Sequence, residues 1–386
     1  MLVFISLLVF LIWIVLFFFW GSFWRVWDFD SDHAQFPAPV AWPRVAAVIP
    51  ARNEAVAIEA AVRALALQDY AGEFSIVVVD DHSDDGTSEL ARRAAHQAGA
   101  AFKVRVVSAP DLASGWTGKL WALNSGMSES ATLESDFLWF TDADVVHAPD
   151  TLRRLISRAE AVSLDLTSLM VLLRAQTFAE RLLIPPFLYF FLMLYPPRWI
   201  ADDGAKTAGA AGGCTLLRRT ALERIGGIAA IRGEVIDDCA LARAVKKSGG
   251  KIWMGLTRAS HSLRSYETFS EIRDMIARTA FSQLQYSTLP LLSTLLGMTV
   301  TFLLPVALTF APDIRVWPFA LLAWCLMTAS FLPTVTFYRL RPVWALLLPL
   351  TAFFYTYATV LSAVRYWLGR GGQWKGRAQA KRKTPA

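Results

Sequence analysis

Phe137-Leu138-Trp139-Phe140-Thr141-Asp142-Ala143-Asp144 is the stretch of sequence that decides the fold. A short apolar run typical of a buried β-strand ends in two aspartates that one residue separates. Residues i and i+2 of a strand point to the same side, so both carboxylates can bind one hard cation through oxygen. A cation held by one or two carboxylates usually takes phosphate oxygens as its other ligands. The stretch therefore predicts a soluble segment that does chemistry on a diphosphate, with Asp142 and Asp144 as metal ligands.

Strands and helices alternate along the chain around that stretch, which is typical of a parallel α/β sheet with a ligand crevice at its strand ends. The first strand is followed by Pro50-Ala51-Arg52-Asn53-Glu54 rather than by a Gly-x-Gly-x-x-Gly turn, and this disfavours an NAD-binding fold. The predicted strands are 45–49, 74–79, 104–107 and 137–140, and the predicted helices are 54–67, 87–98 and 120–127.

The chain as a whole is too apolar for a soluble protein, with 55% hydrophobic residues among 386 and a mean hydropathy of +0.39. Residues 1–24 carry no charge and are long enough to span a bilayer. They lack the basic start and clear cleavage site of a signal peptide, so we expect an uncleaved span. Three further apolar stretches, near 289–311, 317–338 and 343–364, predict membrane helices within residues 288–365.

Two segments predict helices at the membrane surface. Residues 182–200 are apolar, but prolines interrupt them and leave a run too short for a span, which indicates an interfacial or re-entrant piece. Residues 264–287 carry apolar side chains at a spacing of three to four, as in an amphipathic helix that lies in the membrane plane. Residues 25–43, acidic and then proline-rich, are predicted to link the first span to a globular domain at 44–263.

The formal net charge of +6 belongs to the C-terminal end. Seven lysines and arginines lie in residues 365–386 without an acid, so the rest of the chain carries −1. A basic tail at 366–386 fits an anionic leaflet better than nucleic acid. Basic residues around the linker favour a cytoplasmic domain. One span before that domain and three after it would place the tail outside, so either one C-terminal stretch is re-entrant or the 182–200 piece spans.

The three cysteines lie far apart and form no Cys-x-x-Cys motif, so neither a zinc site nor a disulfide framework is indicated. With no intramembrane charge pair and few spans, a transporter is disfavoured. His147, just past the two aspartates, is expected to be a packing or surface residue rather than a ligand.

Two polar loops that fall at predicted strand or helix ends are suited to a nucleotide. In the loop at 80–87, Asp80 and Asp81 could accept hydrogen bonds from a base or ribose, whereas the following acids, Asp84 and Asp85, are expected to cap the next helix. Lys119 lies beside glycines near the start of a predicted helix, where an ammonium group suits a phosphate.

A further loop, residues 233–241, contains Asp237 and Asp238 and follows a small-residue segment that includes Gly212 and Gly213. Glycines allow a substrate to approach the backbone closely. Asp238 would begin a helix at 239–247, so it could simply stabilise that helix N-terminus, or it could deprotonate an acceptor hydroxyl. We favour the role of a base.

Together these motifs resemble the inverting glycosyltransferase family 2, whose GT-A fold has a mixed, Rossmann-like sheet. The likeness covers roughly residues 44–287, and residues 115–122, the N-terminal span and residues 373–377 are similar to the hopene-associated glycosyltransferases. The motifs that carry it are Pro50-Ala51-Arg52-Asn53-Glu54, Asp80-Asp81-His82-Ser83-Asp84-Asp85-Gly86-Thr87, Asp142-Ala143-Asp144 and Asp237-Asp238.

The resemblance implies a role for each matched residue. Asp142 and Asp144 would hold a Mg²⁺ or Mn²⁺ ion that bridges the donor diphosphate, and Asp238 would be the general base. Residues 275–279 lack the tryptophan of the motif found in processive members, which disfavours a chain-extending role. The residues expected to bind the donor are Pro50, Arg52, Asn53, Glu54, Asp80, Asp81, Lys119, Asp142 and Arg278, and those expected on the acceptor side are Gly212, Gly213 and Asp237.

The sequence thus predicts a multi-pass enzyme of the bacterial inner membrane with its catalytic domain in the cytoplasm. It would move a sugar from a nucleotide-diphosphate sugar, a UDP-sugar in the first instance, to a hydroxyl of a membrane lipid. The expected acceptor is a hopanoid or another isoprenoid lipid. The alternatives are a polyprenyl-phosphate sugar transferase and a non-catalytic membrane scaffold that binds nucleotide.

Overall fold

An eight-stranded sheet, with the strand order β3-β2-β1-β4-β7-β6-β8-β5, lies at the centre of the globular part. The computed structural model describes residues 1–27, 29–30, 36–371, 373–374 and 377–378. β1 pairs in parallel with β2 and β4, but β7 is antiparallel to both β4 and β6. The sheet is therefore mixed, as the resemblance implies, and not wholly parallel. The strands are β1 Val45–Ala51, β2 Phe74–Asp80, β3 Val104–Ser108, β4 Phe137–Phe140, β5 Val145–Val146, β6 Leu166–Leu172, β7 Thr215–Arg218 and β8 Ile252–Ser262.

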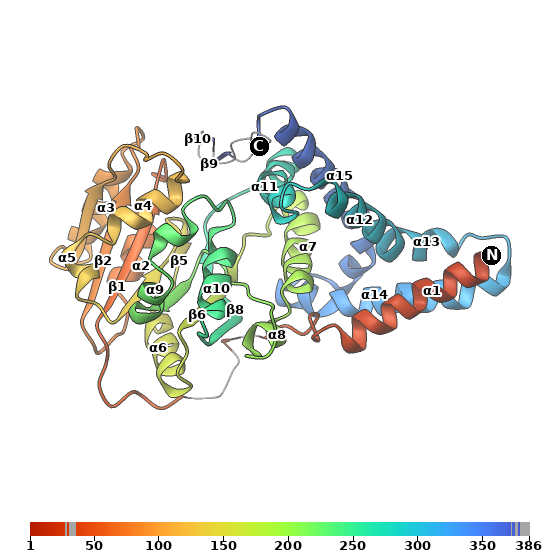
Figure 1. Cartoon of the computed structure of the whole chain (residues 1–386), viewed down its shortest axis with the longest axis horizontal. Helices are drawn as coiled ribbons and strands as arrows, with labels where there is room; N and C mark the ends of the chain where they lie inside the picture. Colours follow the sequence, from red (N-terminus) through yellow and green to blue (C-terminus); the bar gives the residue numbers. More distant parts are fainter. Residues whose placement is uncertain (28, 31–35, 372, 375–376, 379–386) are drawn as a thin grey trace.

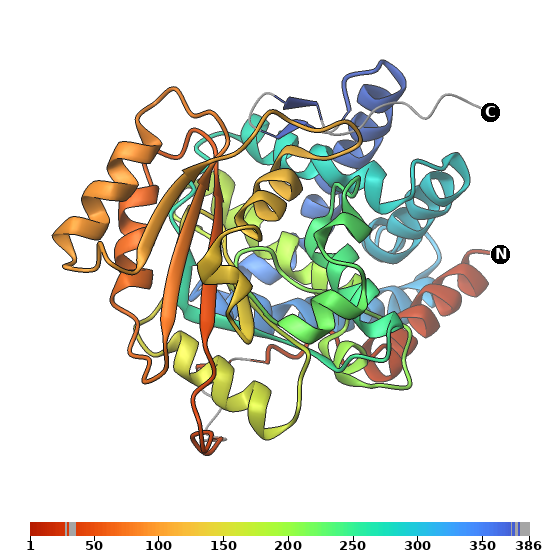
Figure 2. The ribbon, with the colours of Figure 1, turned by 60° about the vertical axis from the view of Figure 1, so that its left-hand side comes forward.

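Helices cover both faces of this sheet because successive strand side chains point to opposite sides. Ala46 and Val48 of β1 belong to one apolar cluster, and Ala47 and Ile49 belong to the other. Figure 2 shows the helices on either side of the strands. The helices on the first face are α4 Gly118–Gly126, α9 Arg219–Arg224 and α10 Asp237–Lys247, and those on the second are α2 Ile58–Ala66, α3 Thr87–Gln97 and α6 Thr151–Ala161.

The strand predictions hold to within two residues, and the strand at 137–140 is confirmed as β4. Helix α2, however, begins at Ile58 and not at residue 54. The reason is a contact with another loop, because the backbone N–H groups of Asn53 and Glu54 donate to the side chains of Ser83 (2.9 Å) and Thr87 (2.9 Å). The turn after β1 is thereby fixed to the loop after β2 instead of entering a helix.

The described part of the segment 25–43 is hydrogen-bonded to β8 near the edge of the sheet. Phe29 is buried, and its N–H donates to the carbonyl of Leu256 in β8 (2.7 Å). The Asp30 carboxylate accepts from the Thr257 hydroxyl (2.7 Å) and from the N–H of Arg258 (2.6 Å). The acidic residues Asp28 and Asp32, on which part of the linker interpretation rests, lie outside the described residues. These contacts couple the first apolar helix to the sheet.

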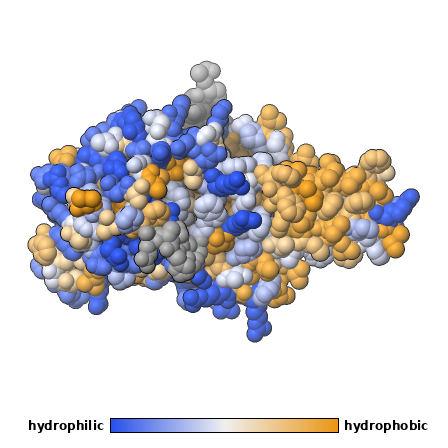
Figure 3. All heavy atoms as spheres, turned by 90° about the horizontal axis from the view of Figure 1, so that it is seen from below, coloured by the Kyte–Doolittle hydropathy of each residue, from blue (hydrophilic) through white to orange (hydrophobic). Residues whose placement is uncertain are grey.

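Four helical segments of the described chain are long and apolar enough to cross a membrane: Leu2–Phe19, Thr288–Leu308, Ile314–Phe337 and Pro342–Trp367. They are built from α1 Leu2–Ile14, α12 Thr288–Met298, α13 Leu304–Leu308, α14 Trp317–Phe337 and α15 Leu348–Trp367, with short π or 3₁₀ turns between them. Figure 3 shows hydrophobic residues covering this end of the molecule on the face drawn, in contrast to the largely hydrophilic domain. This end therefore has the surface expected of a membrane anchor.

Helix α7, Phe178–Leu194, contains Pro185 and Pro186 and packs among the apolar helices. The Tyr189 hydroxyl lies 2.7 Å from the Ser330 hydroxyl of α14, and the Tyr355 hydroxyl of α15 donates to the Leu183 carbonyl (2.7 Å). Protein groups thus surround α7, which with α8 (Pro197–Ala201) makes up the segment predicted to be interfacial or re-entrant.

Helix α11, Phe269–Gln283, corresponds to the predicted amphipathic helix, and it lies side by side with α15. Its apolar residues Ile272, Ile276 and Phe281 are buried against α7 and α15. Figure 1 shows α1, α12–α13 and α14 extending together away from the domain, whereas α15 turns back beside α11. The fourth apolar segment is thus arranged differently from the other three.

Candidate active site

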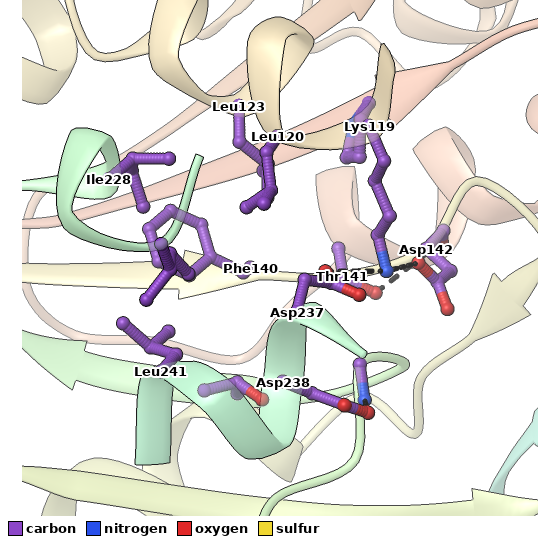
Figure 4. Close-up of a pocket in the computed structure, with 14 residues that line it drawn as sticks. Lys119, Leu120, Leu123, Phe140, Thr141, Asp142, Ile228, Asp237, Asp238 and Leu241 are labelled. Carbon is purple, nitrogen blue, oxygen red and sulfur yellow. Dashed lines mark hydrogen bonds and ion pairs between the residues drawn. The ribbon is translucent and has the colours of Figure 1, made fainter. Parts of the chain in front are cut away.

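A pocket opens where the parallel neighbours β1 and β4 end. In the order of strands across the sheet, the chain continues from β1 to β2 in one direction and from β4 to β5 and β6 in the other. Such a switch point is where open α/β sheets bind ligands. Figure 4 shows apolar side chains gathered on one side of the pocket and the charged groups on the other. The lining residues are Pro50, Lys119, Leu120, Leu123, Phe140, Thr141, Asp142, Gly212, Thr215, Ile228, Ile231, Asp237, Asp238 and Leu241.

Lys119 bridges two carboxylates that come from different elements. Its Nζ lies 2.9 Å from Asp142 Oδ1 at the end of β4 and 3.1 Å from Asp237 Oδ2 at the start of α10 (Figure 4). Burial alone would raise the pKa of Asp142, but the Lys119 ammonium, with Arg264 and Arg278, holds it below its ordinary value. Burial opposes the charge on Lys119, yet the surrounding aspartates raise its pKa, so the ammonium stays charged.

The second aspartate of the motif, Asp144, is bound by a different cation. Its Oδ2 accepts hydrogen bonds from the Ser262 hydroxyl (2.8 Å) and from Arg264 Nε (3.1 Å). The same guanidinium donates to Glu54 Oε1 (2.6 Å), so Arg264 joins the turn after β1 to the end of β4. Arg264 was not identified in the sequence, where it is one arginine just past a strand.

The side chains at this edge of the sheet that could bind a divalent metal ion suit it only together with a substrate that supplies further ligands. Among the described residues, no three His, Cys, Asp or Glu side chains come together as a metal site. Asp142 and Asp144 supply two carboxylates, and Mg²⁺ commonly uses one or two of these with phosphate oxygens completing its shell. The residues present therefore fit an ion that arrives with a diphosphate.

Asp238 lies beside this cluster at the start of α10. Its Oδ2 accepts from the N–H of Gly212 (2.8 Å) and its Oδ1 from the N–H of Cys239 (2.7 Å). Burial, together with the neighbouring charge of Asp237, raises the pKa of Asp238 to about 6. A carboxylate that titrates near neutral pH suits general-base chemistry.

The two glycines expected on the acceptor side point in different directions. A Cβ at Gly212 would lie 2.9 Å from Lys119 Nζ and 3.5 Å from Asp238 Oδ2, so this residue borders the charged cluster. A Cβ at Gly213 would instead meet the side chains of Val171 (3.1 Å) and Val145 (3.3 Å) inside the domain. Of the pair, only Gly212 faces the site.

Comparison with known proteins agrees with this architecture. Residues 46–226 match the family model for glycosyl transferase family 2. The match covers a little under half of the chain, and this segment is similar to family 2 glycosyltransferases. A search of curated proteins returned no match.

One solved structure shares the fold of nearly the whole chain, and others align with part of it. A mannosyltransferase from Pyrobaculum calidifontis, in complex with GDP-Man and Mn²⁺, aligns with a TM-score of 0.56 and 19% identity, covering 95% of this chain and 99% of that chain. Glucosyl-3-phosphoglycerate synthase from M. tuberculosis aligns with a TM-score of 0.38 and 21% identity, covering 62% of this chain and 80% of that chain. The first comparison supports a GT-A fold attached to apolar helices.

The acids of the loop after β2 mostly shape the loop itself. Asp80 accepts from the hydroxyls of Ser83 and Ser88 (2.7 Å for the latter). Asp81 is fully buried, with Arg52 donating to its carbonyl and approaching its carboxylate at 3.7 Å. The loop and the turn after β1 therefore form one hydrogen-bonded unit beside the pocket.

The neighbouring acids of this loop hold it to the turn after β1. Asp85 caps α3, as expected, by accepting from the N–H of Thr87 (3.1 Å). The N–H of Asp84 donates to Asn53 Oδ1 (3.1 Å), so the backbone of Asp84, and not its carboxylate, makes this contact.

Two further residues complete the surroundings. Arg278 is exposed on α11, close enough for its charge to lower the pKa of Asp142. His147 is buried with Nε2 2.8 Å from the Thr141 hydroxyl and its ring against Trp139, and burial lowers its pKa to about 3. It is a neutral packing residue under the Asp142–Asp144 turn, as the sequence suggests.

Proposed function

We propose that the protein is a membrane-bound, inverting glycosyltransferase that moves a sugar from a nucleotide-diphosphate sugar to a hydroxyl of a membrane lipid. One observation carries the proposal. Lys119 joins Asp142, on the donor side, to Asp237, the neighbour of the candidate base Asp238. Donor-binding and proton-accepting groups are thereby combined in a single polar cluster at the switch point of the sheet.

Asp238 would accept the proton of the acceptor hydroxyl as its oxygen attacks the anomeric carbon. The hydrogen bonds from Gly212 and Cys239 hold the carboxylate in place, and its raised pKa keeps it basic enough for the task. One carboxylate suffices, unlike the pair that flanks the bond in glycosidases, because the leaving diphosphate is already a stable anion. A single displacement inverts the anomeric centre.

The leaving diphosphate would face the cations of the site. Asp142 and Asp144 would hold a Mg²⁺ or Mn²⁺ ion, which supplies Lewis-acid stabilisation of the departing oxygens when bound. Lys119, Arg264 and Arg278 would balance the charge that develops on the diphosphate. The structural neighbour in complex with GDP-Man and Mn²⁺ supports this class of donor, so GDP-sugars are tested beside the UDP-sugars that we favour.

The acceptor side suits a neutral, apolar molecule. Asp237 and Asp238 border the pocket next to an apolar wall that includes Phe140, Ile228 and Leu241 (Figure 4). A polyprenyl phosphate would bring its negative charge close to the carboxylates of these two aspartates, and like charges that lie close together repel each other. We therefore favour a hydroxyl-bearing lipid, with a hopanoid or another isoprenoid lipid as the first candidate.

The membrane arrangement that we propose uses three spans: α1, α12–α13 and α14. In it, α15 lies beside α11 at the cytoplasmic surface of a bacterial inner membrane instead of crossing it. An odd number of spans would place both the domain and the C-terminal end in the cytoplasm. Arg365 and Arg370 would then obey the positive-inside rule. The rest of the basic tail lies largely outside the described residues.

Lipid mass spectrometry tests the proposed reaction in cells. A strain that lacks the gene is compared with strains complemented by the wild type, by Asp144→Ala or by the control Asp69→Asn, an exposed aspartate that pairs with Arg153 at the surface. We expect a glycosylated neutral lipid to disappear in the deletion strain and to return with the wild type and the control only. Identical lipids in all strains would refute the proposed function, and loss of a polyprenyl-phosphate sugar instead would refute the hydroxyl acceptor.

A further inference from the structure

Each aspartate of the Asp142–Asp144 motif is already occupied by a side-chain cation. Lys119 Nζ lies 2.9 Å from Asp142 Oδ1, and Arg264 Nε lies 3.1 Å from Asp144 Oδ2. The two ion pairs are separate, with one cation for each carboxylate. One oxygen of each carboxylate that a metal ion would use is thus already paired with a cation of the protein itself.

Both cations are held in place by a second carboxylate. Lys119 also contacts Asp237 Oδ2 at 3.1 Å, and Arg264 also contacts Glu54 Oε1 at 2.6 Å. The Lys119 and Asp144 side chains are only 17% and 11% exposed, whereas their partners Asp142 and Arg264 are 36% and 35% exposed, so water screens these pairs only in part. Neither cation is a loosely tethered surface group that drifts away without cost.

A divalent ion that arrives alone meets two obstacles at this edge. To bind the oxygens that the cations contact, it must displace Lys119 from Asp142 or Arg264 from Asp144. Even at the other oxygen of either carboxylate, it lies within a few ångströms of a positive charge, which repels it. The carboxylates that would attract the ion are the same ones that the cations hold. The site therefore disfavours a metal ion by itself.

A nucleotide diphosphate removes both obstacles at once. Its oxygens supply the remaining ligands that a two-carboxylate site needs. They also offer Lys119 and Arg264 a new anionic partner, because both side chains form charge-assisted hydrogen bonds with phosphate. Each cation can move toward the diphosphate while it keeps its second carboxylate, Asp237 or Glu54.

We propose that Lys119 and Arg264 are placeholders for the metal, which occupy Asp142 and Asp144 in the donor-free protein and transfer to the diphosphate when the donor binds. Metal affinity then depends on the nucleotide, and the protein does not load a metal ion ahead of its donor. Lys119 and Arg264 are positioning residues in this account. The inference rests on the proposed function, since it assumes a nucleotide-diphosphate donor.

Direct measurement of Mn²⁺ binding tests the placeholder role without any turnover. Free Mn²⁺ is followed by electron paramagnetic resonance during titration of the full-length protein in detergent, with no nucleotide, with UDP and with GDP. The variants are Lys119→Met and Arg264→Met, and the matched controls are Lys206→Met and Arg63→Met, which change exposed cations elsewhere in the domain. Thermal melting of each variant confirms that it is folded.

For the wild type we expect Mn²⁺ affinity to rise at least about tenfold when one of the nucleotides is added, as for a coupling of typical size. Each test variant should bind Mn²⁺ without nucleotide about tenfold more tightly than the wild type, because one obstacle is gone. The nucleotide should then enhance binding less, and the control variants should match the wild type. Two independent variants keep the test decisive if one of them fails to fold.

The possible failures are distinguishable. If the wild type binds Mn²⁺ with nucleotide but both folded variants bind Mn²⁺ alone no better than the wild type, the placeholder role is wrong and the proposed function stands. If the wild type binds Mn²⁺ equally well with and without nucleotide, the inference is also overturned. If neither UDP nor GDP supports Mn²⁺ binding at all, both the inference and the proposed donor chemistry fail.

Discussion

Gly212→Ala is the substitution whose effect follows most directly from the geometry of the site. The backbone of Gly212 is not in the left-handed region, so alanine fits its conformation and the change adds only a Cβ. That Cβ would lie 2.9 Å from Lys119 Nζ. Cβ atoms do not normally approach other heavy atoms so closely, so one of the two atoms must shift. It would also lie 3.5 Å from Asp238 Oδ2 and 3.7 Å from Asp142 Oδ2. The ammonium group must therefore move.

Movement of the Lys119 ammonium by a few tenths of an ångström lengthens and weakens at least one of its two ion pairs. A hydrogen bond to a charged group contributes about 1.5–3 kcal/mol, which corresponds to a loss of roughly 10- to 150-fold if it acts in the transition state. We therefore expect the turnover number of Gly212→Ala to fall within about that range. The melting temperature should change little, because alanine reduces the entropy of the unfolded chain and offsets part of the local strain.

The assay measures transfer of radiolabelled sugar from the nucleotide sugar into extracted lipid, with melting temperature measured on the same preparations. Gly213→Ala is the matched control, since its Cβ would press on Val171 and Val145 instead of the charged cluster. The control should lose stability while it retains most of its turnover. Turnover of Gly212→Ala within about threefold of the wild type would refute the reasoning, because displacement of Lys119 should lower turnover by more than this.

Four further predictions concern pH and the anchoring of the domain. Because the pKa of Asp238 is raised to about 6, transfer should fall about tenfold per pH unit below that value, and a flat acid limb would exclude it as the base. The same raised pKa means that its stabilising contribution is present at low pH and lost as the pH rises through about 6, so Asp238→Asn should gain melting temperature relative to the wild type at pH 8 but not at pH 4. For His147, whose pKa is lowered to about 3, stability is full above pH 6.5 and declines progressively toward pH 3, so His147→Gln should flatten this acid decline, and an unchanged slope would contradict it. Asp30→Ala removes the hydrogen bonds to β8 and should lower the free energy of unfolding, measured with denaturant, by about 1–3 kcal/mol. The affinity for UDP–Mn²⁺ should stay unchanged, and equal stability would argue against anchoring of the linker by Asp30.

The parts of the fold and site that the sequence predicts well are those that local pattern determines. The apolar run 137–140 forms β4, and its following aspartate meets Lys119 at the start of α4. Asp237 joins the same cluster from α10, although almost a hundred residues separate it from Asp142. These residues could be placed together because each follows or begins an element whose position in such a fold is regular.

Other features depend on long-range pairing that no local pattern records. Arg264 reaches Asp144 because β8 pairs with β5, so that residue 261 lies opposite residue 146. Asp80 is predicted to contact the donor, and in the structure it accepts hydrogen bonds from serine hydroxyls of its own loop, which the sequence did not indicate. Gly213 faces the interior of the domain just before β7, a strand whose antiparallel pairing the alternation of elements did not reveal.

The helical end shows the same limit. Hydropathy identifies four apolar segments but cannot show that α15 lies beside α11. Likewise, the prolines of α7 suggested an interrupted membrane segment, whereas the structure shows one helix that other helices contact. Tyr355 donates to the Leu183 carbonyl and so ties α15 to α7 just before its two prolines.

The most direct test of the central claim is the rate of sugar transfer to lipid by Asp238→Asn, measured beside its affinity for the Mn²⁺ complex of the active nucleotide. The substitution keeps the size of the side chain and removes its basicity. If Asp238 deprotonates a hydroxyl acceptor, turnover should fall by about 10²–10⁴-fold while nucleotide affinity stays within about threefold of the wild type. Near-normal turnover would contradict the account and would indicate an acceptor, such as a lipid phosphate, that is already an anion.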